Sequence, residues 1–144
     1  MASKREQVVD AVRTLIAAAL PLAEVKRNLD KPERISPGGL IIVRDGDPGE
    51  PDVLLSPLTY IYTHRVVIEL AAYASDTLTR EQVLDQMLAA IGTAIMVNRT
   101  LGGLCDFLET EAPTSDDIEA AGAKAGRWAE AAIIASYATA NPLI

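Results

Sequence analysis

The sequence predicts an α+β domain in which two helices pack on one face of a mostly antiparallel sheet, in the order α-β-β-β-α-β-β. Two long segments repeat apolar residues with the 3.6-residue period of an amphipathic helix. Between them, one long segment alternates apolar and polar residues as a half-buried strand does. With 144 residues, the chain is expected to form a single domain over residues 1–144.

The first helix is expected over Lys4–Leu20. Ser3 and Glu6 have the spacing of a capping box, which satisfies two backbone N–H groups at a helix start. Pro21 cannot continue a helix and is expected to end this one. The apolar residues that share one helical face are Val8, Val9, Val12, Leu15, Ile16, Ala19 and Leu20.

Two short strands are expected before the long alternating segment. Glu24–Asn28 carries the charges that discourage unwanted pairing, so an edge strand is predicted. Leu40–Val43 is apolar and rich in β-branched residues, as in a buried strand. Turn-forming residues mark a loop between them: Pro32, Pro37, Gly38 and Gly39.

The segment after Leu40–Val43 is acidic and rich in turn-forming residues. Asp45–Asp52 contains Gly46, Pro48, Gly49 and Pro51 and is too long for a two-residue hairpin turn, so it is expected to be an exposed loop. Val53–Leu55 could resume strand pairing after it.

The longest predicted strand is Thr59–Tyr73, well above the usual length of about 5–6 residues. Such a strand is expected to bend or to project beyond the sheet. Its more apolar face, expected to meet the helices, carries Tyr60, Tyr62, His64, Val66, Ile68 and Leu70. The opposite face carries Ile61, Thr63, Arg65, Val67 and Glu69.

The second helix is expected over Thr79–Asn98. Thr79 and Gln82 form a capping box, and Gly102 and Gly103 turn the chain after the helix. The apolar stripe of this helix consists of Val83, Leu84, Met87, Leu88, Ile91, Ala94 and Ile95.

The last third of the chain is expected to add two strands. Cys105–Glu109 is predicted to be a strand, and Thr114–Asp117 an acidic loop. Trp128–Thr139 has strand character, while its alanines make a helix the competing prediction; we favour the strand. The alanine-rich stretch Ala120–Ala135 weakens that strand prediction. A sheet covered on one side would leave its other face and its edges available to neighbours.

Composition narrows the function classes. The net charge of −7 and the lack of a basic cluster argue against sequence-specific DNA binding, although an acidic protein can line a channel through which DNA passes. Cys105 is the only cysteine, so no internal disulfide is possible. No apolar run approaches the roughly 20 residues of a membrane span, and the amphipathic first segment is not expected to be a secretory signal.

Candidate catalytic groups are sparse. His64 and Cys105 lack the spacing of a nucleophile pair, and structural roles are favoured for both. Asp45, Asp47, Glu50 and Asp52 faintly resemble a calcium loop but lack its twelve-residue pattern, so a solvated turn is favoured. No enzyme activity, cofactor or metal is expected. Tyr60 and Tyr62 could anchor an interface or pack under the helices.

Four segments carry a resemblance to a known family. The first is the amphipathic N-terminal helix leading into Val25–Asn28. The second is Gly39–Pro51 followed by Leu55–Tyr60, and the third is the helix ending in Asn98–Asp106. The fourth is Ala138–Leu143 near the end. Together they resemble the tail terminator (tail completion, or head–tail joining) proteins of long-tailed, siphovirus-like phages and of gene transfer agents.

The resemblance implies a structural virion protein, assembled in the bacterial cytoplasm and placed at the head-proximal end of the tail. Its implied partners are further copies of itself in a ring, usually a hexamer, the tail tube protein, and a head–tail connector or stopper protein. DNA would pass through the ring without sequence-specific binding. Candidate contacts with neighbours or partners are Asp45, Asp47, Glu50, Asp52, Tyr60, Tyr62 and Arg99. A head–tail stopper or connector adaptor is the alternative, and a small enzyme is a more distant one.

Overall fold

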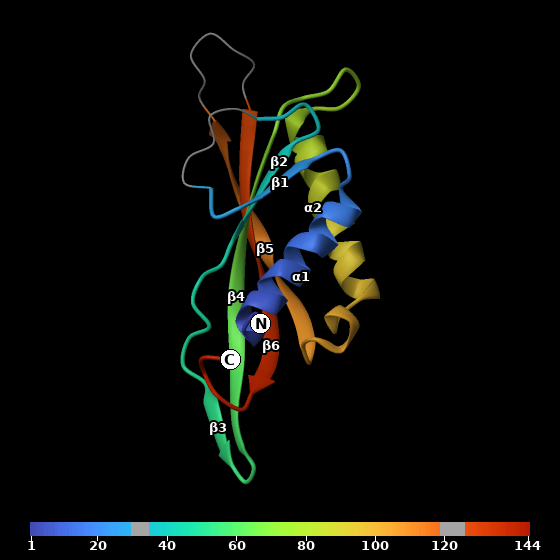
Figure 1. Cartoon of the computed structure of the whole chain (residues 1–144). Helices are drawn as coiled ribbons and strands as arrows, with labels where there is room; N and C mark the ends of the chain where they lie inside the picture. The colour runs from blue at the N-terminus through green and yellow to red at the C-terminus, as the bar shows by residue number, and fades with distance from the viewer. Residues whose placement is uncertain (30–34, 119–125) are drawn as a thin grey trace.

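The computed structural model describes residues 1–29, 35–118 and 126–144, which form a six-stranded sheet with two helices on one face (Figure 1). Five strands follow the spatial order β1-β2-β4-β6-β5, and β3 pairs with the far end of β4. The elements in chain order are α1 (Lys4–Ala19), β1 (Glu24–Arg27), β2 (Leu40–Arg44), β3 (Asp52–Leu55), β4 (Leu58–Ala72), α2 (Arg80–Val97), the 3₁₀ turn η1 (Leu101–Gly103), β5 (Phe107–Ile118) and β6 (Gly126–Thr139).

The strand pairing confirms the expected α+β class. β1 and β2 are parallel, and the other pairs of this sheet are antiparallel. The longest ladder joins β4 to β6, from Tyr60 opposite Thr139 to Ala72 opposite Arg127. The element order gains one strand over the expected order, because Asp52–Leu55 pairs with β4.

Helix α1 begins at the expected residue but has only half of the expected capping box. The Ser3 hydroxyl accepts a hydrogen bond from the Glu6 backbone N–H at 3.3 Å. The Glu6 carboxylate instead binds Arg27, because a guanidinium is a stronger partner than a backbone N–H. The face that α1 buries consists of Val8, Val9, Val12 and Ile16.

Helix α2 has the complete capping box, with Thr79 and Gln82 each bonding the other's backbone N–H. Its fully buried residues are Leu84, Met87, Ile91 and Ile95, one per turn along a single face. Val83 and Leu88 flank this face and are half-buried against the core.

The helix-covered face of β4 is the one that alternation predicted. Tyr62, His64, Val66, Ile68 and Leu70 are buried there. The expected projection of this strand is also present, since β4 runs for 15 residues and its first residues pair only with β3 and the end of β6.

The opposite face of the sheet is less open than expected. Leu40, Ile42 and Ala71 form a second buried cluster there, against which Leu29, Ile35 and Trp128 pack. Beside this cluster, Arg44 pairs with Glu69 at 2.8 Å. The expectation of a free second face therefore fails at this end, because the chain on either side of residues 30–34 contributes apolar side chains that cover it. The loop residue Pro32 itself lies outside the described residues.

The expected acidic loop at Thr114–Asp117 is wrong. Strand β5 begins at Phe107, two residues later than expected, and continues through this segment, where Thr114 lies opposite Glu130 and Asp117 opposite Arg127. A register shift between Glu111 and Thr114 accommodates Ala112 and Pro113. Acidic residues suit an edge strand because they oppose pairing with another chain, so their presence did not require a loop.

Strand β6 confirms the strand prediction for Trp128–Thr139 over the helical alternative. Its alanines lie between β4 and β5, and Ala129, Ala132 and Ala135 are almost fully buried there. Of the alanine-rich stretch, residues 120–125 lie outside the described part of the chain, and the remainder belongs to β6.

Candidate assembly interface

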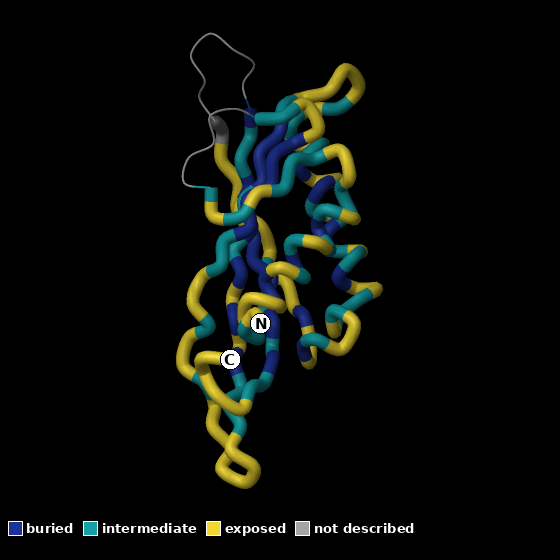
Figure 2. The backbone as a smooth tube through the Cα atoms, viewed as in Figure 1, coloured by how far each residue is buried: buried dark blue, intermediate teal, exposed yellow. Residues whose placement is uncertain are grey.

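The hairpin of β3 and β4 brings four exposed apolar side chains together: Val53, Leu54, Leu55 and Leu58. Leu55 lies opposite Leu58 and Val53 opposite Tyr60, with Ser56 and Pro57 at the turn. Leu54 is 55% exposed and Leu55 83% exposed. Figure 2 shows the hairpin tip as exposed, and Figure 1 shows it projecting beyond both helices. Within one copy, these apolar side chains therefore remain partly or largely exposed to water.

One face of the hairpin continues the face of β4 that the helices cover elsewhere. Side chains alternate along a strand, so Leu58 shares a face with Tyr60 and Tyr62. Cross-strand pairing places Val53 and Leu55 on that same face. The apolar stripe of β4 therefore runs past the end of the helix layer, where the described residues leave Val53, Leu55 and Leu58 partly or largely exposed.

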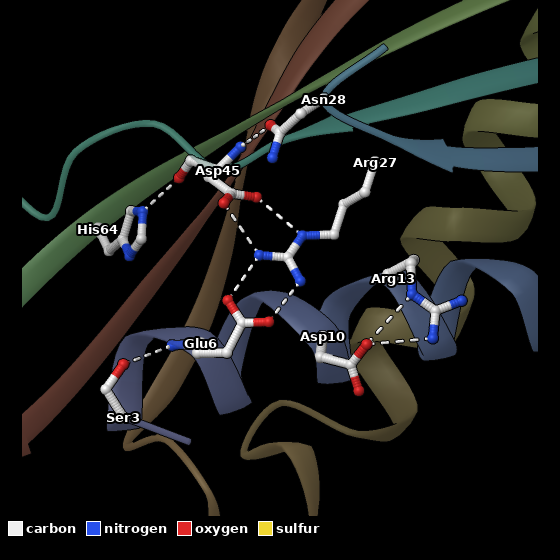
Figure 3. Close-up of polar contacts among 8 residues, drawn as sticks. All are labelled: Ser3, Glu6, Asp10, Arg13, Arg27, Asn28, Asp45 and His64. Atoms are coloured by element: carbon white, nitrogen blue, oxygen red, sulfur yellow. Dashed lines mark hydrogen bonds and ion pairs between the residues drawn. The ribbon is translucent and has the colours of Figure 1, made fainter. Parts of the chain in front are cut away.

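Asp45, the first residue of the predicted loop, is held tightly at the end of β2. The Arg27 guanidinium donates to both carboxylate oxygens of Asp45, at 2.8 and 2.9 Å, and to both of Glu6, at 2.7 and 2.8 Å (Figure 3). These hydrogen bonds lower the pKa of both carboxyl groups and raise that of Arg27. The Arg27 cluster, meaning Glu6, Arg27 and Asp45, thus joins α1, β1 and the end of β2.

The backbone of Asp45 is held as firmly as its side chain. Its N–H donates to the Asn28 side chain at 3.0 Å, and its carbonyl lies 2.6 Å from His64 Nε2. A carbonyl only accepts, so Nε2 carries the proton and Nδ1 accepts from the Tyr137 hydroxyl at 2.9 Å. Burial lowers the pKa of His64, which favours this neutral form.

The two candidate tyrosines differ in position. Tyr62 is only 7% exposed and stacks near Tyr137 at a centroid distance of 5.8 Å, so of the two open alternatives the structure shows core packing. Tyr60 is half-buried at the edge of the core, where the hairpin begins. Burial raises the pKa of Tyr137 to about 12, so its hydroxyl stays protonated at neutral pH.

The other predicted loop residues, Asp47, Glu50 and Asp52, are exposed; Asp47 and Glu50 lie in the segment before the hairpin, whereas Asp52 is the first residue of β3, so the loop ends one residue earlier than expected. Gly46 gives the chain room to leave the Arg27 cluster. Its φ is +62°, and a Cβ there would lie 2.8 Å from the Arg65 carbonyl oxygen. Asp45 thus anchors the loop, while the three following acids face solvent.

Arg99 joins the end of α2 to the start of β5. Its guanidinium donates to the Leu108 carbonyl at 2.8 Å and lies 5.0 Å from the Phe107 ring centroid. The seven candidate contact residues therefore do not form one cluster. Asp45, Tyr62 and Arg99 stabilise the fold, and the remaining four lie in or beside the loop and hairpin.

His64 and Cys105 do not act on one another through any hydrogen bond that the structure shows. Both ring nitrogens of His64 are engaged as described, while Cys105 lies near the Arg99 carbonyl, with its pKa raised by burial. Across the described residues, no three His, Cys, Asp or Glu side chains gather as a metal site would require. Within the same residues, no helix is long and apolar enough to cross a membrane.

A groove between α1 and α2 is the site that sequence reasoning missed. It has a volume of about 700 Å³ and opens on the solvent side of the helices. Small and apolar residues form most of its walls, among them Leu15, Ala18, Ala90, Ala94 and Val97. A signal was present: alanines cluster in the last turns of α1 and in the middle of α2, where larger side chains would have closed the gap.

A scan of protein-family models finds no match to this chain, and a search of curated proteins finds no match either.

Proposed function

We propose that this chain is the ring-forming tail terminator of a long-tailed phage or a gene transfer agent. In this role, copies form a ring that caps the tail tube and joins it to the head connector. The observation that carries the proposal is the β3–β4 hairpin, which exposes Val53, Leu54, Leu55 and Leu58 beyond the helix layer. Apolar side chains in such a position are typical of a surface that another protein covers.

The acidic charge supports the same role. The net charge is −7, and Asp47, Glu50 and Asp52 are exposed around the hairpin base. Acidic side chains repel DNA phosphates, so an acidic lumen lets DNA pass without binding it. The resemblance in the four sequence segments, together with the two-helix, one-sheet fold that it implies, also supports the proposal.

The decisive experiment examines particles that are assembled without this protein. Electron microscopy should show overlong tails, or tails that fail to join filled heads. Complementation with the wild-type chain should restore normal joining and serves as the control. Tails of normal length, correctly attached to filled heads in the mutant, would oppose the proposal.

A binding experiment separates the terminator from a stopper or connector adaptor. The purified chain is mixed with headless tails and, separately, with tailless heads, and bound protein is measured after sedimentation. A terminator completes the tail before joining, so it should sediment with headless tails. Binding only to tailless heads would favour the stopper or adaptor.

A further inference from the structure

We infer that the apolar face of the β3–β4 hairpin packs into the α1–α2 groove of a second copy of this chain. The hairpin face consists of Val53, Leu55 and Leu58, and the groove is the one lined by Leu15, Ala18, Ala90, Ala94 and Val97. This contact between copies deepens the proposed function and rests on it, because a ring requires that each subunit bind the next.

The first argument is continuity of the β4 face. From Tyr62 to Leu70 this face is buried beneath the two helices of its own copy. The stripe continues through Leu58 into the hairpin, beyond the reach of those helices (Figure 1). The solvent side of a helix pair from a second copy offers apolar side chains that could cover the remainder.

The second argument is the match of polarity. The hairpin from Val53 to Tyr60 contains no charged residue, and neither do the residues that line the groove. Thr93 and Asn98 are the polar lining side chains, and the Asn98 side chain already accepts a hydrogen bond from the Gly102 N–H. Each copy has a net charge of −7, so two copies repel one another on average. Electrostatic repulsion opposes close contact least where both surfaces are uncharged.

The third argument is shape. The hairpin protrudes beyond the helices, and the groove is a broad, open depression whose walls are largely alanine. Because the two surfaces differ, each copy can pass its hairpin to the next copy, which is a heterologous contact, or two copies can exchange hairpins across a two-fold axis; a ring requires the heterologous arrangement. Repeating a heterologous contact joins subunits head to tail and closes a ring when the rotation allows. An isologous dimer, hairpin against hairpin, would stop at two copies.

The test uses two full-length variants that each remove one half of the contact. Leu55→Asp places a charge on the hairpin face, and Leu54→Asp, on the opposite face of the same strand, is its control. Thr93→Glu places a charge in the groove, and Gln86→Glu, exposed on α2 outside the groove, is its control. Circular dichroism and thermal unfolding establish that each variant folds.

Association is measured by sedimentation and by NMR of a ¹⁵N-labelled copy, at up to about 1 mM so that weak binding is detected. Leu55→Asp and Thr93→Glu should each weaken self-association by about tenfold or more, while the two controls associate as the wild type does. When the labelled Leu55→Asp variant is mixed with unlabelled Thr93→Glu, one intact contact remains. A 1:1 dimer should then form, with amide shifts confined to the groove of the labelled copy.

The outcomes separate this inference from the tail-terminator role. If Thr93→Glu associates normally and the mixture gives no groove shifts, the hairpin does not bind the groove, and the inference is overturned. If Leu54→Asp is as damaging as Leu55→Asp, the assigned hairpin face is wrong. The terminator role is decided independently by the tail length and head joining of particles that lack the protein.

Discussion

His64 shows how one buried polar residue can hold three parts of this fold together. Its ring bonds the Asp45 carbonyl at the end of β2 and the Tyr137 hydroxyl on β6, while the residue itself belongs to β4. Asp45 is in turn bound to Arg27 and, through it, to Glu6 of α1. The start of the exposed loop is therefore fixed by contacts to α1, β1 and β4.

Stability should fall when the pH drops below the ordinary pKa of histidine. Burial lowers the pKa of His64 from 6.5, so the unfolded chain binds the proton more tightly than the folded one. The contribution of His64 is complete above pH 6.5 and is lost as the pH falls towards the lowered pKa. Urea unfolding at about pH 7.5 and 5.5 measures this loss.

A His64→Gln variant is the control for that measurement, because glutamine does not titrate. Its free energy of unfolding should change less between the two pH values than that of the wild type. Glu6 and Asp45 do not confuse the comparison, since their lowered pKa values place their losses below about pH 4.5. Equal pH dependence in the two proteins would contradict the assignment of a neutral, buried His64.

Tyr137→Phe should destabilise the chain by about 1–3 kcal/mol. The substitution leaves His64 Nδ1 buried without its hydroxyl donor, and an unsatisfied buried acceptor has a cost of that order. Tyr60→Phe, the same change at a half-buried position, is the comparison and should cost less. A loss for Tyr137→Phe below about 0.5 kcal/mol in urea would show that this hydrogen bond contributes little.

At the scale of elements, α2 covers the sheet with four buried residues, Leu84, Met87, Ile91 and Ile95. The half-buried Val83 and Leu88 flank them. Ile91→Ala should lower the free energy of unfolding by about 2–5 kcal/mol, because the side chain is almost fully buried. Met96→Ala, on the exposed side of α2, should change it by less than about 0.5 kcal/mol. Chemical denaturation measures both, and similar effects of the two changes would show that α2 does not pack as described.

Leu88 falls between those two extremes. It is half-buried and lies beside Ile68 and Ile91 in a smaller hollow beneath α2. The apolar period of α2 placed Leu88 in the stripe but did not distinguish a central position from a flanking one. That difference depends on where α2 rests on β4, β5 and β6, which is a property of packing.

At the scale of the whole molecule, the exposed acids around the hairpin should act on assembly and not on folding. The triple variant Asp47→Asn, Glu50→Gln and Asp52→Asn leaves the size of each side chain almost unchanged and removes three negative charges. The free energy of unfolding should stay within about 0.5 kcal/mol, since the three side chains are exposed.

The same triple variant should form particles in which fewer filled heads carry tails, because DNA is repelled less where these acids face it. Counts of joined particles by electron microscopy measure the effect, with the single Asp76→Asn change in an exposed turn as the control. Equal counts for the triple variant and the wild type would remove these acids from the proposed mechanism.

The local patterns of the sequence were sufficient for most of the fold. Capping signals and apolar periods located both helices to within one or two residues at either end, and alternation identified the buried face of β4. These features arise from interactions between residues close in the chain, so a local pattern records them. Proline and glycine marked the loop at Asp45–Asp52 for the same reason.

The remaining features depend on residues far apart in the sequence. Arg27 meets Glu6 and Asp45 across 21 and 18 positions, and Tyr137 meets His64 across 73. Thr114–Asp117 has the composition of a loop when taken in isolation, and it is a strand because β6 offers it hydrogen-bonding partners. The groove exists because α1 and α2 lie side by side with alanines facing each other. The hairpin is exposed because β4 extends beyond the helices that cover the rest of the strand. Long-range pairing and packing set these positions; the alanines of the two helices and the length of the β4 segment indicated only that a gap and a projection were possible.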